Sequence, residues 1–221
     1  MRVDRGPCAF ILQTVATHAI RPPQYAGRMN HAFARAVSIF GHPMLVLPLA
    51  ALAVAIARGQ GRAAAWMALG FAVFAAVVMS YSWWQVRRGR WAHVDASNKD
   101  ERRSLNRFLV VALIVSAILA MRYGHDRELG LGLGLSAAMI MLAMLTARWC
   151  KLSLHMAFVV FAATLLWSVA WWAGLAGFAC AAAVAWSRLQ LQRHVPRDLL
   201  AGAATGLLAG SVFLLASGMV A

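Results

Sequence analysis

Four residues that could do chemistry together lie in the segment SRLQLQRHVPRD, between two long apolar runs: Ser187, Arg188, His194 and Asp198. Ionisable groups at a membrane boundary are costly unless they pair with one another or act on a ligand. If a helix begins near Pro196, His194 and Asp198 lie one turn apart on one face. The carboxylate could then accept the Nδ1 proton of the imidazole and leave Nε2 free as a nucleophile.

Arg188 adds an anion-binding group to this pair. Its guanidinium is always charged and presents a planar fork of donors that matches the oxygens of a phosphate. A nucleophilic histidine, an orienting carboxylate and an anion-binding arginine together are typical of phosphoryl transfer. We therefore expect a phosphoryl-transfer site in this segment.

Two other loops have a high density of polar residues. The segment Arg87–Arg107 (RRGRWAHVDASNKDERRSLNR) places Asp95, Asp100 and Glu101 among many basic side chains. The segment Arg148–His155 (RWCKLSLH) places a serine and a histidine at the start of an apolar run. A helix start presents free backbone N–H groups and the positive end of a dipole, which favour a bound anion. Both loops are therefore candidates for the same site.

Apolar helices must position these loops. The chain has 221 residues, of which 62% are hydrophobic, against roughly 45–50% in soluble domains. Runs near the ~20 residues that cross a bilayer recur along it. We expect spans at Pro43–Ala57, Ala63–Trp84, Phe108–Tyr123, Leu129–Ala147, Leu154–Trp172, Gly174–Trp186 and Leu199–Val220. Because the first and the sixth are short, the sequence predicts an all-α, polytopic bundle of about six or seven transmembrane helices.

Connectivity brings the polar segments together. If each run crosses the membrane, the loops after the second, fourth and sixth spans emerge on the same side, and these loops contain all three segments. Residues 1–41 form a separate basic segment, in which Arg28–Phe40 has the apolar spacing of an amphipathic helix at the membrane interface. Residues 42–221 form the transmembrane domain that holds the expected site.

The formal net charge of +14 would suggest nucleic acid in a soluble protein. Here the basic residues lie in loops between spans, where cytoplasmic retention and anionic headgroups explain them. We therefore expect no nucleic-acid partner, and an integral protein of a bacterial-type plasma membrane. The positive-inside rule favours the cytoplasmic face for the motif-bearing side. Cys8, Cys150 and Cys180 have no metal-ligand spacing, so we expect neither a metal nor a disulfide framework.

The polar segments resemble the signature of the type 2 phosphatidic acid phosphatase and vanadium haloperoxidase superfamily, in its membrane lipid phosphatase branch. That signature has a Lys-x6-Arg-Pro, a Pro-Ser-Gly-His and a Ser-Arg-x5-His-x3-Asp element. The residues that match the third element at every fixed position are Ser187, Arg188, His194 and Asp198. The second element is matched in part, because Ser153 and His155 are kept while its proline and glycine are replaced.

The first element is not matched as written. A helix through this segment places Lys99, Arg103 and Arg107 on one face at i, i+4 and i+8, so we expect them to bind phosphate in its place. Arg102 lies about 100° around that helix from Arg103. The alternative is that the segment from Lys99 to Arg107 is only a run of charged residues exposed to solvent. In that case the phosphate is held by Arg188 and Lys151.

The resemblance implies a helical membrane phosphatase that acts on a lipid phosphate or prenyl diphosphate and needs no metal or other cofactor. It implies that His194 attacks phosphorus to form a phosphohistidine and that His155 protonates the leaving alkoxide. It also implies that Asp198 holds His194, while Arg188 and Ser153 bind the phosphoryl oxygens.

Three other functions can be compared with this one. A haloperoxidase is disfavoured because those enzymes are large soluble chains. A non-catalytic lipid-binding or transport protein that has kept part of the motif fits the incomplete first and second elements, but does not need both His194 and His155. Prenyl transfer needs repeated Asp-rich clusters for Mg²⁺-diphosphate, which this chain lacks.

Overall fold

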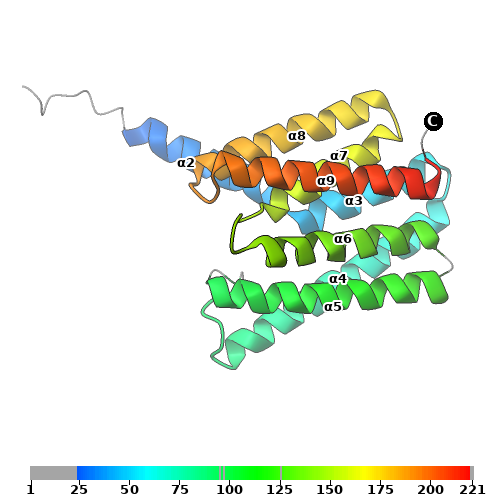
Figure 1. Cartoon of the computed structure of the whole chain (residues 1–221), viewed down its shortest axis with the longest axis horizontal. Coiled ribbons are helices and arrows are strands. Elements are labelled where there is room, and N and C mark those ends of the chain that lie inside the picture. Colours follow the sequence, from blue (N-terminus) through cyan, green and yellow to red (C-terminus); the bar gives the residue numbers. More distant parts are fainter. Residues whose placement is uncertain (1–23, 95, 97, 125, 220–221) are drawn as a thin grey trace, which may run out of the picture.

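The computed structural model describes residues 24–94, 96, 98–124 and 126–219, and this part of the chain is helical without any strand. Its helices, labelled as in Figure 1, are α2 (Gln24–Phe40), α3 (Pro43–Ala57), α4 (Gly61–Arg87), α5 (Lys99–Arg122), α6 (Arg127–Thr146), α7 (Leu154–Trp167), α8 (Trp171–Gln190) and α9 (Pro196–Ser217). The predicted all-α, polytopic architecture is confirmed.

The helices α3 to α9 correspond one to one to the predicted apolar runs, and α3 has the predicted bounds. Among the described residues, five helices are long and apolar enough to cross a membrane alone, namely α4, α5, α6, α8 and α9. Residues 31–40 and α3, which meet at an angle of 48°, form a sixth candidate if they count as one broken span. Six or seven spans were expected, and five to six candidates are found among the described residues. α7 is not counted because it has only 14 residues, which is short for crossing a bilayer alone.

The predicted boundary between the fifth and sixth runs is wrong by several residues. α7 ends at Trp167 and α8 begins at Trp171, so Trp172 belongs to the later helix. The turn between them is tight because Gly174 has no side chain, and Trp167 packs directly against it. Hydropathy did not locate this turn because the residues around it are almost all apolar. α8 also continues beyond Trp186, through the first two residues of the third motif element.

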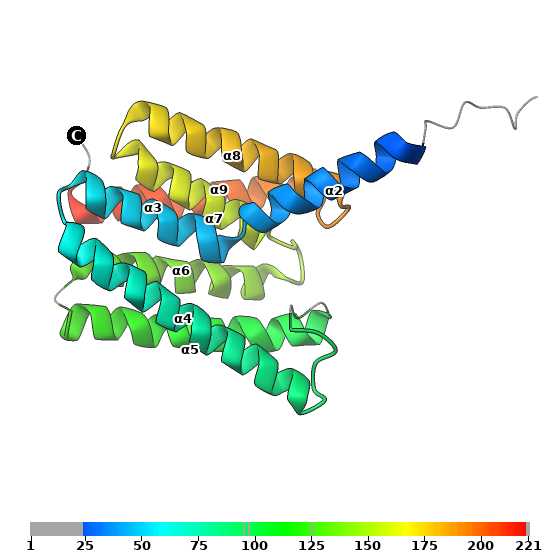
Figure 2. The same ribbon diagram turned by 180° about the vertical axis from the view of Figure 1, so that it is seen from behind.

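The three polar segments lie at the same end of the bundle, as the connectivity predicts. In Figure 1 the α4–α5, α6–α7 and α8–α9 connections all lie at the left-hand end. The α3–α4, α5–α6 and α7–α8 connections lie at the opposite end, and the reverse view in Figure 2 shows the same division. The order of the spans therefore suffices to gather the candidate residues near one face.

α7 is the central helix, and the fit of α9 against it sets the geometry of the motif residues. Gly202, Gly206 and Gly210 on α9 lie so close to α7 that a Cβ at any of them would collide with atoms of α7 or of Ser153 just before it. Small residues at every fourth position allow helix axes to approach in this way. As a result the backbone N–H of Ser153, just before α7, donates to the carbonyl of Asp198 in the first turn of α9, at 3.1 Å.

α2 packs against α8. The buried hydroxyl of Ser187 donates to the backbone carbonyl of Ala34 at 2.6 Å. At the bend between α2 and α3, Gly41 lies directly against Val184 of α8. The described part of the basic N-terminal segment is thus attached to the bundle through a residue of the third motif element. Residues 1–23 of that segment lie outside the described part of the chain.

Candidate active site

The pair His194 and Asp198 is placed by the start of α9. The helix begins at Pro196, whose ring fixes a helical φ angle at the first position. His194 precedes the helix, and its Nδ1 lies 3.5 Å from Oδ2 of Asp198. That distance is longer than a normal hydrogen bond, and Nδ1 is buried without a hydrogen-bond partner in the described chain. Catalytic hydrogen bonds are often long before the reaction and tighten in the transition state.

His155 lies in the first turn of α7 and adjoins two other histidines. Its ring meets the ring of His42 edge to face, with the centroids 5.1 Å apart. Arg188 is close enough to interact electrostatically with His42, His155 and His194. Residues from the start of α3, the start of α7, the end of α8 and the loop before α9 therefore converge on one spot.

Arg188 is the most unusual residue of this cluster. It lies in the last turn of α8, and only 3% of it is exposed. Its Nε has no hydrogen-bond partner, and no carboxylate within the described residues forms an ion pair with its side chain. A buried cation is costly unless an opposite charge compensates it. The environment of Arg188 therefore favours a bound anion.

His194 lies in the loop between α8 and α9, and its surroundings favour the neutral imidazole. Burial lowers the pKa of His194 from its ordinary value, and the positive charges of Lys151 and Arg188 lower it further. The carboxylate of Asp198 acts in the opposite direction and raises the pKa, without cancelling the other effects. His194 therefore carries a free electron pair at neutral pH, as a nucleophile requires.

The cluster lines one end of a large, partly open cavity with a volume of about 2830 Å³. The wall at this end includes His42, Lys151, His155, Arg188 and His194. Asp198 lies behind this wall, as does Ser153, which is fully buried and whose Oγ has no hydrogen-bond partner among the described residues. The role of Ser153 in binding a phosphoryl oxygen stays a prediction.

The basic residues of α5 line the same cavity but make no described contact with the histidines. Lys99, Arg103 and Arg107 all belong to its wall, and so does Arg102, although the helical spacing suggested that it would face elsewhere. Glu101 does not pair with these arginines. Its carboxylate accepts the backbone N–H groups of residues 92 and 98, at 2.8 and 3.1 Å, and so caps the start of α5. Asp95, the other candidate carboxylate, lies outside the described residues.

Two residues of the cluster were not predicted as site residues from the sequence. His42 directly precedes the predicted span that begins at Pro43, and its Nδ1 accepts the backbone N–H of Met44 at 3.2 Å. The packing of α3 against α7 additionally brings its ring to His155. Arg193, whose backbone carbonyl accepts from Lys151 Nζ at 3.4 Å, also lines the cavity. No local pattern signals either role, because both depend on helix packing.

No group of three His, Cys, Asp or Glu side chains within the described residues is arranged to hold a metal ion. Comparisons of this chain with protein-family models, with curated proteins and with solved structures return no match. The arguments for function therefore come from the residues and their geometry.

Proposed function

We propose that this chain is an integral membrane phosphatase that hydrolyses a lipid phosphate or prenyl diphosphate through a phosphohistidine, in the manner of the type 2 phosphatidic acid phosphatases that its motifs resemble. The observation that carries the proposal is the buried Arg188, which faces the cavity without a carboxylate partner in the described chain, beside His155 and His194. A phosphate at this point supplies the missing negative charge.

In the proposed first step, Nε2 of His194 attacks phosphorus and the bond to the leaving oxygen breaks. His155 gives a proton to that oxygen, so a lipid phosphate leaves as the alcohol and a prenyl diphosphate leaves as the prenyl monophosphate. The phosphorylated imidazole keeps its Nδ1 proton, and the carboxylate of Asp198 stabilises the positive charge of the ring. His155 must carry its proton close to the cation of Arg188, and the negative oxygens of a bound phosphate offset that repulsion.

In the second step a water molecule attacks the phosphohistidine. His155, now neutral, accepts a proton from this water, the P–N bond breaks, and inorganic phosphate leaves. Arg188 and Lys151 stabilise the charge on the phosphoryl oxygens in both steps, since both line the cavity beside His194. The same cavity wall also contains Lys99, Arg103 and Arg107. In this proposal their positive charges attract the anionic headgroup into the cavity.

The proposal predicts that the purified protein in detergent releases phosphate from a panel of lipid phosphates, and that EDTA leaves the rate unchanged. Vanadate should inhibit, because its trigonal-bipyramidal form resembles the transition state. The measurement is inorganic phosphate release from phosphatidic acid, a prenyl diphosphate and phosphatidylglycerophosphate. Absence of release from all of them, with lipid binding retained, would favour a non-catalytic lipid-binding protein. Activity that requires added Mg²⁺ after chelation would contradict the histidine mechanism.

The lowered pKa of His194 predicts a specific pH dependence. The nucleophile acts as the neutral imidazole, so on the acid side of the profile kcat/KM should begin to fall below the ordinary histidine value of about 6.5. In Lys151→Gln one of the charges that lower the pKa of His194 is gone, so the pKa should rise and the acid limb should move to higher pH. Ionisation of the substrate is common to both proteins and cancels in the comparison. An acid limb that stays in place or moves to lower pH contradicts this assignment.

A further inference from the structure

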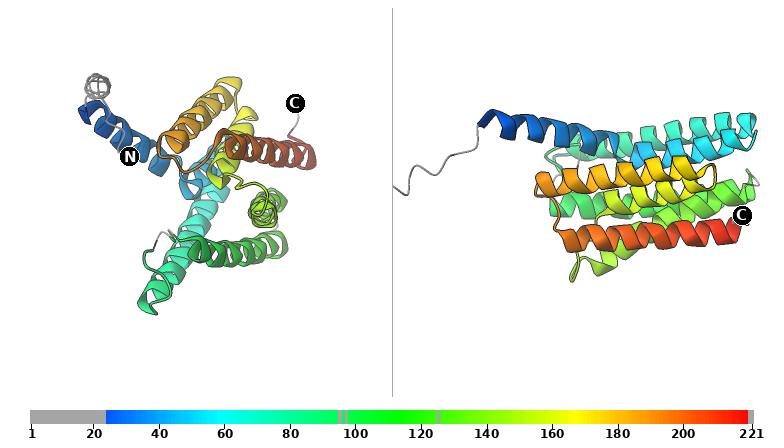
Figure 3. Two further views of the ribbon diagram at one scale, coloured as in Figure 1. Left: turned by 60° about the vertical axis from the view of Figure 1, so that its left-hand side comes forward. Right: turned by 90° about the horizontal axis from the view of Figure 1, so that it is seen from above.

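His42 lies at the bend between α2 and α3, and the packing of this bend on α8 places it beside Arg188. Gly41 lies directly against Val184 of α8, and a Cβ at Gly41 would collide with that side chain. Arg188 follows Val184 by one helical turn on the same face of α8. Figures 2 and 3 show α2 running beside the end of α8 and leading into α3. The fold therefore holds His42 next to the buried arginine, which acts on it electrostatically.

The hydrogen bond at the start of α3 fixes which nitrogen of His42 carries the proton. Nδ1 accepts the backbone N–H of Met44 at 3.2 Å, so Nδ1 must hold a free electron pair. In a neutral imidazole the other nitrogen, Nε2, then carries the hydrogen. A protonated ring would have N–H groups at both positions and would lose this bond. The helix start therefore keeps His42 as a neutral ring whose Nε2–H is a donor and not a base.

The ring of His42 is exposed and lines the cavity together with His155. The centroids of the two rings are 5.1 Å apart and their planes are at 89°. Nδ1 and Nε2 lie on different edges of an imidazole, so the bond to Met44 occupies one edge and leaves the other available to a ligand. His42 thus offers an N–H donor in the part of the cavity wall that also contains Arg188 and His194.

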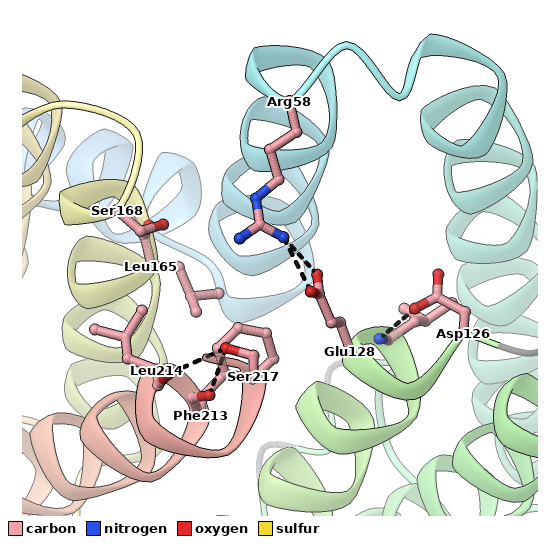
Figure 4. Close-up of polar contacts among 9 residues, drawn as sticks. Arg58, Asp126, Glu128, Leu165, Ser168, Phe213, Leu214 and Ser217 are labelled. Carbon is pink, nitrogen blue, oxygen red and sulfur yellow. Dashed lines mark hydrogen bonds and ion pairs between the residues drawn. The ribbon is translucent and has the colours of Figure 1, made fainter. Parts of the chain in front are cut away.

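The two ends of the cavity differ in charge. At the far end, Arg58 at the end of α3 donates to both carboxylate oxygens of Glu128 in the first turn of α6, at 3.0 and 2.8 Å (Figure 4). Both residues line the cavity, as do Lys151 and Arg188 at the histidine end. Neither of these two cations forms an ion pair with a carboxylate of the described chain. An anion in the cavity is therefore attracted to the end at which His42 lies.

We propose that His42 is a further phosphate-binding residue, whose Nε2–H donates to a non-bridging oxygen of the phosphoryl group held at Arg188 and His194. This inference rests on the proposed function and adds a donor to the set assigned there. His194 is the nucleophile and His155 gives its proton to the leaving oxygen, so neither ring supplies a hydrogen to the non-bridging oxygens. His42 supplies one as a neutral ring, whereas a further cation would oppose protonation of His155.

Asparagine and glutamine at position 42 separate the roles of the two ring nitrogens. The amide oxygen of asparagine lies near the place of Nδ1 and accepts from Met44, as a good N-cap residue does, but this side chain is too short to replace Nε2. Glutamine reaches the place of Nε2 with an amide N–H and is not a preferred N-cap residue. We therefore expect His42→Asn to keep the Tm and lose the phosphate contact, and His42→Gln to do the reverse.

The measurement is equilibrium dialysis of labelled orthophosphate with the full-length protein in detergent, which needs no turnover. His42→Asn should weaken binding about tenfold or more, as expected when a hydrogen bond to a charged group is lost, and His42→Gln should keep most of the affinity. His93→Asn and His93→Gln should change neither binding nor Tm, because His93 is exposed and is not among the cavity-lining residues. In turnover, His42→Asn should lower kcat/KM of a lipid phosphate and of nitrophenyl phosphate by the same factor, because both substrates have the same non-bridging oxygens.

The inference is overturned if orthophosphate binds to His42→Asn as tightly as to the wild-type protein, if His42→Gln is the weaker binder of the two variants, or if the wild-type protein does not bind orthophosphate. A protein that gives one of these results but hydrolyses lipid phosphates keeps the proposed function and loses the role of His42. A protein that binds orthophosphate through His42 but releases no phosphate from any lipid loses the proposed function and keeps the binding site.

Discussion

Replacing His194 by alanine is expected to abolish phosphate release and formation of a phosphorylated enzyme together. In the proposed mechanism the nucleophile itself is then gone, and Arg188 and Lys151 cannot form the covalent intermediate in its place. We expect the rate to fall by at least about 10³-fold, on the scale seen when a catalytic nucleophile is removed. The measurements are phosphate release in steady state and trapping of labelled phosphate on the protein after a rapid alkaline quench.

His93→Ala is the matched control for this experiment, because His93 is exposed and is not among the residues that line the cavity. It should retain both turnover and the phosphoenzyme. A His194→Ala protein that still becomes phosphorylated at the wild-type level would show that another residue is the nucleophile. If the variant loses turnover but is still phosphorylated, His194 acts in hydrolysis of the phosphoenzyme and not in its formation.

The second large effect is expected for His155→Ala, and it should depend on the leaving group. An alkoxide leaves only when it is protonated, so loss of the general acid should slow a lipid phosphate by about 10²–10⁴-fold. A nitrophenolate is stable without a proton, so nitrophenyl phosphate should lose far less. The measurement is kcat/KM of both substrates with the wild-type protein and the variant. Equal losses on the two substrates would remove His155 from the role of acid.

The variant His42→Asn tests whether the acid role belongs to His155 itself or depends on the adjacent ring of His42. Asparagine is a good N-cap residue and can accept the backbone N–H of Met44 in place of His42. The variant therefore keeps the start of α3 while it deletes the edge-to-face contact with His155. If His155 is the acid, His42→Asn should leave the ratio between the two substrates close to that of the wild-type protein.

Much of the fold could be predicted from the sequence because its signal is local. Apolar runs near the length that crosses a bilayer identified the helices α3 to α9, and the order of the runs predicted that the three polar loops share one end. The start of α9 at Pro196 was predictable since proline fixes the backbone at a first helical position. His194 lies just before that helix, so its position beside Asp198 depends on the loop conformation as well as on the four-residue spacing.

The site was only partly predictable, because side-chain environments depend on which helices pack together. Ser187 belongs to the motif, yet its hydroxyl is bonded to Ala34 and attaches α2 to α8. Ser153 matches the motif as well, but the close packing of α9 on α7 buries it behind the cavity wall. In the same way Glu101, located within a run of arginines, caps the backbone of α5 instead of neutralising them.

The sequence by itself determined that the chain is a helical membrane protein, where its polar loops emerge, and that a histidine and an aspartate lie one helical turn apart. These properties follow from hydropathy and from the 3.6-residue period, which act over neighbouring residues. Only the tertiary structure decided that His42 meets His155, that Arg188 is buried without a described carboxylate partner, and that one cavity extends from them to Arg58 and Glu128. Those features arise where α3, α7, α8 and α6 approach one another, and contacts between residues far apart in the chain leave no periodic signal in the sequence.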